Sequence, residues 1–257
     1  MVSHVAYSVE AAVARITLNR PERMNAISLA LGNELRAALD DAGSRADVNV
    51  IVIRGSGGNF CAGGDFDAVQ RLRDQGPDAL RELFEAFGSA CAAIGSVPVP
   101  VVVAVEGVAM AGGFELIQAA DVVLVRDDAR IADNHINFAM IPGGGSTGRL
   151  PRIVGRQAAL GLLLSGDRLS GLDAVQRGLA YRSFPPAEFD TSVETFVTKL
   201  AGRDRAAVTT IKRLVGESCG QPLDRALTDE IDAVVAHICG QAGQAGVAAF
   251  QNRGAHV

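Results

Sequence analysis

Two segments of the chain consist almost entirely of small residues and could present backbone N–H groups to a negatively charged oxygen. They are FCAGGDF at 60–66 and GVAMAGGFEL at 107–116, and each follows an apolar run that predicts a buried strand. If these strands are parallel neighbours, both segments leave the sheet at the same edge, where each can direct an N–H at one oxygen. The pattern therefore predicts an oxyanion hole made of backbone, with Gly64 and Gly112 as candidate donors.

Glu115 is the candidate for moving protons beside this hole. Gly112 would begin a helix, whose N-terminal N–H groups and dipole favour a developing negative charge. Glu115 follows three residues later, one turn along the same helix, so its carboxylate would face the same cleft. The alternative is an ordinary first-turn glutamate that is stabilised by the helix dipole.

A third glycine-rich segment, GGGSTG at 143–148, matches two further patterns. Its glycines fit the GxGxxG of dinucleotide sites, but Pro142 stands where the end of a buried strand is expected. Its Ser146 fits the GxSxG elbow of serine hydrolases, with INFAMI as the strand and Asp167 and His237 as the acid and the base. A plain glycine turn that lets a helix pack closely is favoured over both.

Hydrophobic patterning indicates the elements that must position these residues. Alternation at 13–18 and runs rich in β-branched residues at 48–53, 101–105 and 122–125 predict strands. Apolar stripes at helical spacing between them predict helices that contain Leu31–Ala42 and Leu80–Ile94. Alternating strands and helices predict an α/β fold.

The hydrophobic pattern of the sequence changes after Phe184-Pro185-Pro186, and beyond this point it is almost entirely helical. We therefore expect a core at 1–186 that binds substrate and carries the chemistry. We expect a helical region at 187–257 that serves in oligomerisation and in closing the substrate site.

Composition excludes several classes of function. A net charge of −5 gives no basic footprint for nucleic acid. The four cysteines are not spaced as zinc or redox pairs, and the first ten residues lack the features of a signal peptide. The longest apolar run, 97–105, contains two prolines and is too short to span a bilayer. We expect a cytoplasmic protein with reduced thiols.

Taken together, the motifs resemble the crotonase (enoyl-CoA hydratase/isomerase) superfamily along nearly the whole chain. The matching segments are ITLNRP at 16–21, MNA at 24–26, VIRG at 52–55, FCAGGD at 60–65, PV at 100–101 through to Gly107, AGGFEL at 111–116, IPG at 141–143, RL at 149–150, LSG at 164–166 and AVQRGL at 174–179. The resemblance implies a spiral of ββα units with C-terminal helices, assembled as a trimer or a dimer of trimers. It also makes GGGSTG a non-catalytic turn.

The resemblance further implies the parts of an acyl-CoA site. Gly64 and Gly112 would hold the thioester oxygen, and Glu115 matches the first of two catalytic glutamates. Coenzyme A would belong to the substrate, with no metal or organic cofactor. Its contacts would be the loop residues Arg23, Met24 and Ala26, the backbone of Ala62, Asp65 and Phe66, and Phe250 as a closing residue from the C-terminal helix.

One departure from the family pattern bears on the reaction. The second glutamate of the hydratases lies seven residues before the proline of Ile-Pro-Gly, and that position is His135 here. An imidazole can hold water and exchange a proton near neutral pH, and nearby Asp133 is the alternative participant. The sequence favours a hydratase-like enzyme for 2-enoyl-CoA, with an isomerase or another enolate reaction as the second hypothesis. We expect residues around 66–90 and 138–142 to line the acyl pocket.

Overall fold

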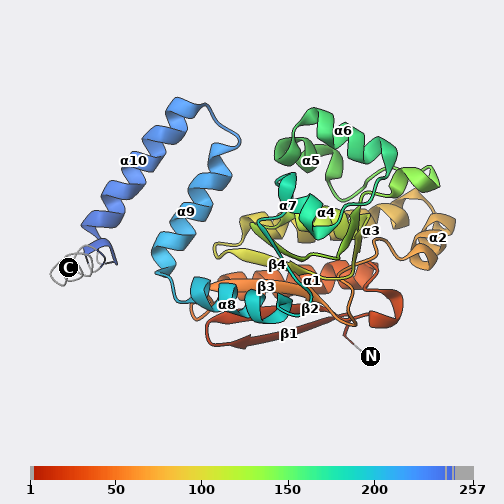
Figure 1. The fold of residues 1–257 in the computed structure, drawn as a ribbon, viewed down its shortest axis with the longest axis horizontal. Helices are drawn as coiled ribbons and strands as arrows, with labels where there is room; N and C mark the ends of the chain where they lie inside the picture. Colours follow the sequence, from red (N-terminus) through yellow and green to blue (C-terminus); the bar gives the residue numbers. More distant parts are fainter. Residues whose placement is uncertain (1–2, 241, 245, 247–257) are drawn as a thin grey trace.

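The computed structural model describes residues 3–240, 242–244 and 246. Its main sheet has six strands in the order β1-β2-β3-β4-β6-β8 (Figure 1). The pairing of β1 with β2 is antiparallel and every other pairing is parallel. The strands are β1 Val5–Glu10, β2 Val13–Leu18, β3 Val50–Gly55, β4 Val101–Val105, β6 Val122–Arg126 and β8 Arg182–Phe184.

A second, two-stranded parallel sheet joins β5 (Val108–Met110) to β7 (Arg130–Ala132). Isolated bridges extend this layer, because Cys61 pairs with Ala109 and Ile131 pairs with Leu169. The small sheet therefore carries the chain from the end of β4 to the helix that contains Glu115.

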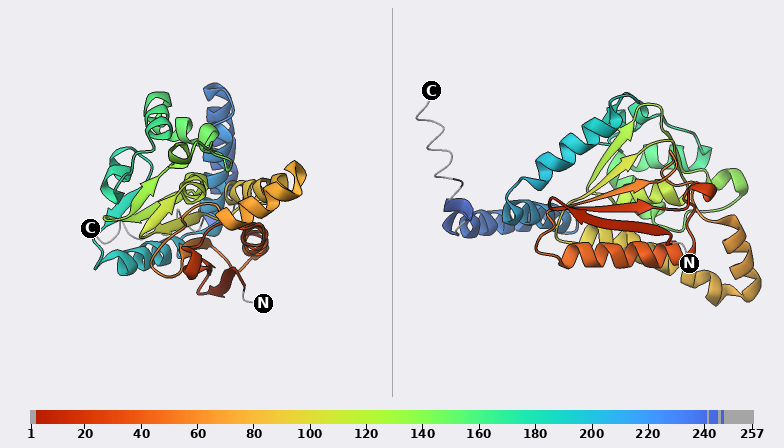
Figure 2. Two further views of the ribbon diagram at one scale, coloured as in Figure 1. Left: turned by 90° about the vertical axis from the view of Figure 1, so that its right-hand side faces the viewer. Right: turned by 90° about the horizontal axis from the view of Figure 1, so that it is seen from below.

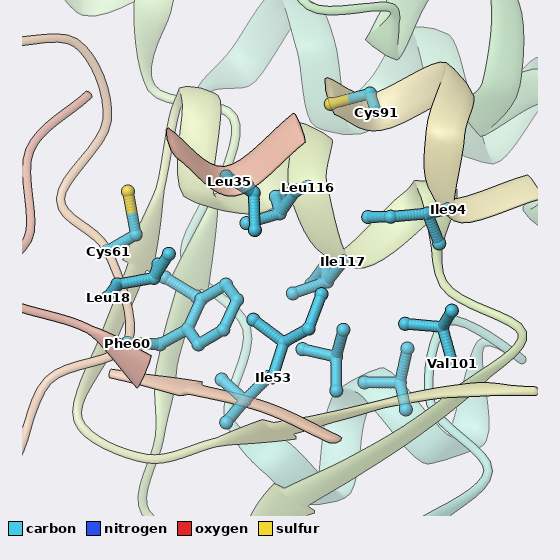
Figure 3. Packing of buried hydrophobic residues seen from close by; sticks show 14 of the residues in the cluster. Leu18, Leu35, Ile53, Phe60, Cys61, Cys91, Ile94, Val101, Leu116 and Ile117 are labelled. Atoms are coloured by element: carbon cyan, nitrogen blue, oxygen red, sulfur yellow. The ribbon is translucent and has the colours of Figure 1, made fainter. Parts of the chain in front are cut away.

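Helices α1 and α3 pack against each other and cover one face of the main sheet. Every member of the predicted apolar stripe on α1 is buried. Figure 3 shows this core, in which Leu35 of α1 lies with Leu18, Ile53 and Phe60. The helices that precede residue 186 are α1 Leu29–Ser44, α2 Phe66–Gln75, α3 Pro77–Ser96, α4 Gly112–Ala119, α5 Ser146–Val154, α6 Arg156–Ser165 and α7 Gly171–Gln176, with short 3-10 turns η1 Pro21–Arg23 and η2 His135–Phe138.

The opposite face of the sheet is covered by α8 (Phe189–Ala201). Phe189, Val193 and Val197 are buried against β2, β3, β4 and β6. The strands therefore carry apolar residues on both faces, as their runs rich in β-branched residues predict. Since α8 packs with the core, the helices that project from it begin after residue 201.

Helices α9 (Arg205–Ser218) and α10 (Leu223–Cys239) extend away from the sheet (Figures 1 and 2). Neither helix buries any residue completely. Their exposed apolar side chains are Ile211, Val215, Leu223, Leu227, Ile231, Val234, Val235 and Ile238. None of the described helices is both long enough and apolar enough to cross a membrane.

Lys212 attaches α9 to the core. Its Nζ lies 2.6 Å from Asp121 Oδ2 and donates to the carbonyls of Ile94 (2.8 Å) and Val99 (3.0 Å). Burial lowers the pKa of Lys212 and raises the pKa of Asp121, because it penalises both charges, while the attraction within the pair opposes both shifts. The ammonium thus satisfies three acceptors at the base of the projecting helix.

We predict that Lys212→Met lowers the free energy of unfolding by about 1–3 kcal/mol, because three acceptors lose their donor in a partly buried site. Arg213→Met on the same helix is the matched control, since Arg213 forms only an exposed i,i+4 pair with Glu217. Urea denaturation measures both variants. Equal stability of the two variants would contradict the anchoring role.

Candidate active site

The two small-residue segments meet as a parallel backbone pair. Cys61 N donates to Val108 O and Met110 N donates to Cys61 O, each over 2.9 Å. On the other side, Ile27 N donates to Gly63 O over 2.7 Å. Main-chain hydrogen bonds therefore fix the 61–65 segment between two neighbours.

Gly64 and Gly112 both line one cavity of about 260 Å³. Among the described residues, neither backbone N–H has a hydrogen-bond acceptor. Gly112 is the first residue of α4, where an N–H has no partner within the helix. The sequence-predicted donors are thus brought together with their hydrogens available for a ligand.

The backbone around these donors is strained and tightly packed. Ala111, which precedes α4, has φ 48° and ψ −114°, a conformation that non-glycine residues rarely adopt. A Cβ on Gly112 would lie 2.5 Å from Ile27 Cδ1, and one on Gly63 would lie 2.7 Å from Ala111 Cβ. Glycine is required at position 63, where φ is +106° and the Cβ would meet the facing segment, whereas a Cβ on Gly112 would need the Ile27 side chain to move.

Glu115 lies in the first turn of α4, lines the same cavity and is 2% exposed. Its Oε1 accepts hydrogen bonds from Gly144 N (2.6 Å) and Ser146 N (3.2 Å). Its Oε2 has no partner among the described residues. Burial raises the pKa of Glu115, and the two N–H donors and His135 oppose that rise only in part. The two hydrogen bonds to Oε1 thus orient the carboxyl group, and Oε2 stays available to a ligand in the cavity.

The GGGSTG segment is the turn that holds Glu115. A Cβ on Gly144 would lie 2.2 Å from the Phe87 ring and 2.9 Å from Glu115 Oε2, so the close approach requires glycine. Sequence reasoning predicted a turn for close helix packing and missed these two donors. The signal that could have revealed them is the run of three glycines itself, since only residues without side chains let a backbone reach a buried carboxylate.

The serine-hydrolase hypothesis is wrong. Residues 135–138 form the 3-10 turn η2, so INFAMI is not the strand that a nucleophile elbow needs. Ser146 is fully buried, and its Oγ accepts from Gln118 Nε2 over 2.8 Å. Asp167 is exposed and His237 lies on the projecting helix α10. The three side chains do not form a triad.

His135 also lines the cavity, and Asp133 lies behind it. The ring Nδ1 is 2.7 Å from Asp133 Oδ1, and Asp133 is 1% exposed. Burial lowers the pKa of His135, but the hydrogen bond and charge of Asp133, together with the charge of Glu115, outweigh this effect and raise the pKa overall. The two residues that the sequence offered as alternatives are therefore one hydrogen-bonded pair.

Two of the predicted coenzyme A contacts, Ala62 and Phe66, line the cavity. The Phe66 ring meets Phe138 edge-on, with the ring centroids 6.3 Å apart. Asp65 instead has a structural role, because its side chain caps α2 at Ala68 N and pairs with Arg20 over 2.7 Å. The backbone N–H of Asp65 is also occupied, since it donates to a carbonyl.

Three of the remaining predicted contacts, Arg23, Met24 and Ala26, lie before α1. Arg23 is exposed and pairs with Asp67 over 2.9 Å, while Met24 O accepts from Ala62 N over 2.9 Å. Ala26 is buried. Phe250 lies outside the described residues, so its predicted position stays a prediction.

Apart from Asn134, the rest of the cavity wall is apolar, and much of it comes from the two ranges that the sequence predicts for an acyl pocket. The apolar side chains are Ile27, Phe66, Val69, Leu83, Phe84, Phe87, Phe138, Met140 and Ile141. Ile27 was missed because it precedes both ranges and reaches the cavity through its pairing with Gly64. Within the described part of the chain, no group of three or more His, Cys, Asp and Glu residues could hold a metal ion.

Comparisons with known proteins identify the relatives of this chain. The family model for enoyl-CoA hydratase/isomerase matches residues 8–256. A protein named probable enoyl-CoA hydratase from Rhodobacter capsulatus is 34% identical over 253 residues, which cover 96% of this chain and 94% of the relative. A peroxisomal Delta(3,5)-Delta(2,4)-dienoyl-CoA isomerase from Arabidopsis thaliana is 30% identical, with 81% and 78% covered.

Solved structures give the same answer for the fold. The crystal structure of an enoyl-CoA hydratase from Bacillus anthracis superposes with a TM-score of 0.92 at 27% identity, covering 97% of this chain and 96% of that one. The chain therefore belongs to the enoyl-CoA hydratase/isomerase family, and the predicted crotonase fold is confirmed.

The raised pKa of Glu115 predicts a pH-dependent stability difference. The folded protein holds this proton more tightly than the unfolded chain, so ionisation of Glu115 costs stability as the pH rises through its folded-state pKa. Glu115→Gln is neutral and keeps an acceptor for the two N–H groups. Its unfolding free energy relative to wild type should therefore increase from about pH 4 to about pH 8.

Urea denaturation at several pH values measures this difference. Glu85→Gln is the control, because the Glu85 side chain is 67% exposed. This substitution should change the unfolding free energy only slightly at every pH. A constant difference between Glu115→Gln and wild type across this range would contradict the prediction.

Proposed function

We propose that the protein catalyses the reversible addition of water to a 2-enoyl-CoA. The observation that carries this proposal is the cavity in which two unpartnered backbone N–H groups, of Gly64 and Gly112, lie with the buried carboxyl group of Glu115. Family membership supports the same class of chemistry, since the relatives are named as hydratases and as an isomerase of enoyl-CoA thioesters.

The reaction places negative charge where these donors can meet it. When water adds to C3 of an α,β-unsaturated thioester, electrons move onto the thioester oxygen and form an enolate. Two preorganised N–H groups stabilise that oxygen more strongly in the enolate than in the substrate. Loss of one such donor typically costs about 3–4 kcal/mol, so the hole supplies a large share of the rate.

Glu115 and His135 would divide the proton transfers. Because burial raises its pKa, Glu115 holds a proton near neutral pH more readily than an exposed glutamate does. It protonates C2 through its unpartnered Oε2. His135 holds the water and takes its proton as the oxygen bonds to C3. The charge states are restored when the proton returns from His135 to Glu115.

Coenzyme A would enter as part of the substrate, with its acyl group in the apolar cavity. Its outer parts would pass Ala62 and Phe66 and the exposed loop at Arg23 and Met24, with Phe250 closing the site. All of the proton steps use side chains of the chain itself, and no resident cofactor is invoked.

Isomerisation of a 3-enoyl-CoA is the second candidate. Moving a double bond needs one base that takes a proton and returns it to another carbon, and Glu115 can do both. Two observations favour this candidate: His135 replaces the second glutamate, and the Arabidopsis relative is named as a dienoyl-CoA isomerase.

We predict that acetoacetyl-CoA binds as its enolate, because the two N–H groups stabilise that charge. The measurement is the rise of enolate absorbance on titration. Parallel assays with crotonyl-CoA and a 3-enoyl-CoA then separate hydration from isomerisation. If no binding occurs at millimolar ligand, acyl-CoA chemistry at this site is excluded.

We predict that Glu115→Gln lowers kcat by about 10²- to 10⁴-fold, the range expected when a general acid–base group is lost. Ser146→Ala is the matched control, because its hydroxyl contacts Gln118 and not the cavity. That variant should retain most of its activity. Full activity in a folded Glu115→Gln protein would show that another group moves the proton.

The apolar side chains of α9 and α10 support a trimer or a dimer of trimers, since exposed apolar surface of this extent usually marks an interface. Light scattering should give a mass three or six times that of one chain. Ile231→Lys, at a side chain that is 61% exposed, should shift the population toward the monomer. A wild-type monomer at micromolar concentration would refute the assembly.

A further inference from the structure

The second proton-transfer position of this chain is occupied by two residues and not one. Asp133 and His135 are hydrogen-bonded over 2.7 Å between Oδ1 and Nδ1, and the backbone N of His135 also lies 3.4 Å from the same Oδ1. The carboxylate therefore contacts both the ring and the main chain of the same histidine, which restricts the ring to one orientation.

This contact determines which ring nitrogen carries the hydrogen. An ionised carboxylate is only an acceptor, so Nδ1 must be the donor in the pair. The other nitrogen, Nε2, is on the opposite edge of the ring and has no hydrogen-bond partner among the described residues. His135 lines the cavity with Glu115, so Nε2 is the ring atom left to exchange a proton there.

The burial of Asp133 makes the pairing strong. Asp133 is 1% exposed, and its Oδ2 has no hydrogen-bond partner within the described part of the chain. A buried carboxylate with so few donors depends on its one close partner. His135 is that partner, and any state in which the ring lost its Nδ1 hydrogen would leave the charge of Asp133 uncompensated.

We propose that Asp133 is a positioning residue that fixes His135 with its Nδ1 hydrogen on the carboxylate and its Nε2 directed to the acyl-CoA cavity as the proton-exchanging atom. This inference rests on the proposed function, because it specifies how His135 takes the proton of water. Asp133 itself does not touch the substrate.

The charges around the ring raise the proton affinity of His135. Asp133 on its own segment and Glu115 on α4 both raise the pKa of His135, against the effect of burial. The guanidinium of Arg149 on α5 donates to Gly144 O over 2.6 Å. Asp133 therefore also makes His135 a stronger base for the proton of water.

The first test reads the tautomer directly in the free enzyme. In ¹⁵N-labelled wild type, long-range ¹H–¹⁵N spectra should show neutral His135 with its hydrogen on Nδ1, and His135→Gln identifies the signals by their loss. A hydrogen on Nε2 in neutral His135 would overturn the inference without any variant of Asp133.

The second test removes the charge and keeps the shape. Asp133→Asn should move the titration of His135 to lower pH, because the neighbouring negative charge that stabilises the imidazolium is gone. It should lower kcat by about 10- to 100-fold, as expected when a proton-transfer group is misplaced or weakened, and leave KM nearly unchanged. An unchanged titration and unchanged kcat would overturn the inference.

Asp127→Asn is the matched control. Asp127 is a partly buried aspartate and, like Asp133, has one carboxylate oxygen without a hydrogen-bond partner in the described structure. It does not line the cavity. It should change neither the His135 titration nor kcat. In a His135→Gln background, Asp133→Asn should have little further effect on kcat, because a residue that acts through His135 has nothing left to position.

These outcomes can be distinguished from failure of the proposed function. Enolate binding of acetoacetyl-CoA depends on the backbone N–H groups and does not need His135. If the wild type binds that enolate and Asp133→Asn is unaltered in titration and rate, only the positioning role fails. If the wild type binds no acyl-CoA, the proposed function fails whatever the tautomer of His135.

Discussion

The parallel pairing of Cys61 with Ala109 is the contact on which the rest of the site depends. Its hydrogen bonds bring two loops from different strands of the sheet together along their main chains. A Cβ on Gly113 would lie 2.2 Å from Cys61 O, so this approach is possible only because the residues that face each other are small. Once the pairing is made, the N–H groups of Gly64 and Gly112 share one cavity, and α4 begins at its wall.

The close approach of the two small-residue segments also places charged groups inside the protein. Glu115 and Asp133 are 2% and 1% exposed, and burying an ionised carboxylate is costly unless donors compensate it. The fold compensates Glu115 with two backbone donors and Asp133 with an imidazole. The compensation of Glu115 is partial, because burial still raises its pKa. Stability and reactivity are therefore linked through the same hydrogen bonds.

The periphery of the molecule follows a different principle. Where the two small-residue segments meet, backbone hydrogen bonds leave no room for large side chains, whereas the projecting helices α9 and α10 present large apolar side chains to the exterior. A single buried ammonium, Lys212, ties α9 to the end of α3 and the start of β4. The core thus holds the site, and the C-terminal helices leave apolar side chains exposed.

The sequence by itself determined four strands of the main sheet (β2, β3, β4 and β6), the helices α1 and α3 and the two small-residue loops. Periodicity is a local property, so the unbroken runs at 101–105 and the stripe on α1 sufficed, and Glu115 could be placed one turn after Gly112. The tertiary structure alone decided which groups meet. The donor from Gly144 reaches Glu115 across 29 residues of chain, and Ser146 is buried against Gln118 although its motif suggested a nucleophile. The tertiary structure also joined Asp133 to His135 and placed α8 against the sheet. Such contacts depend on how separate segments pack in space, and local spacing carries no information about that packing.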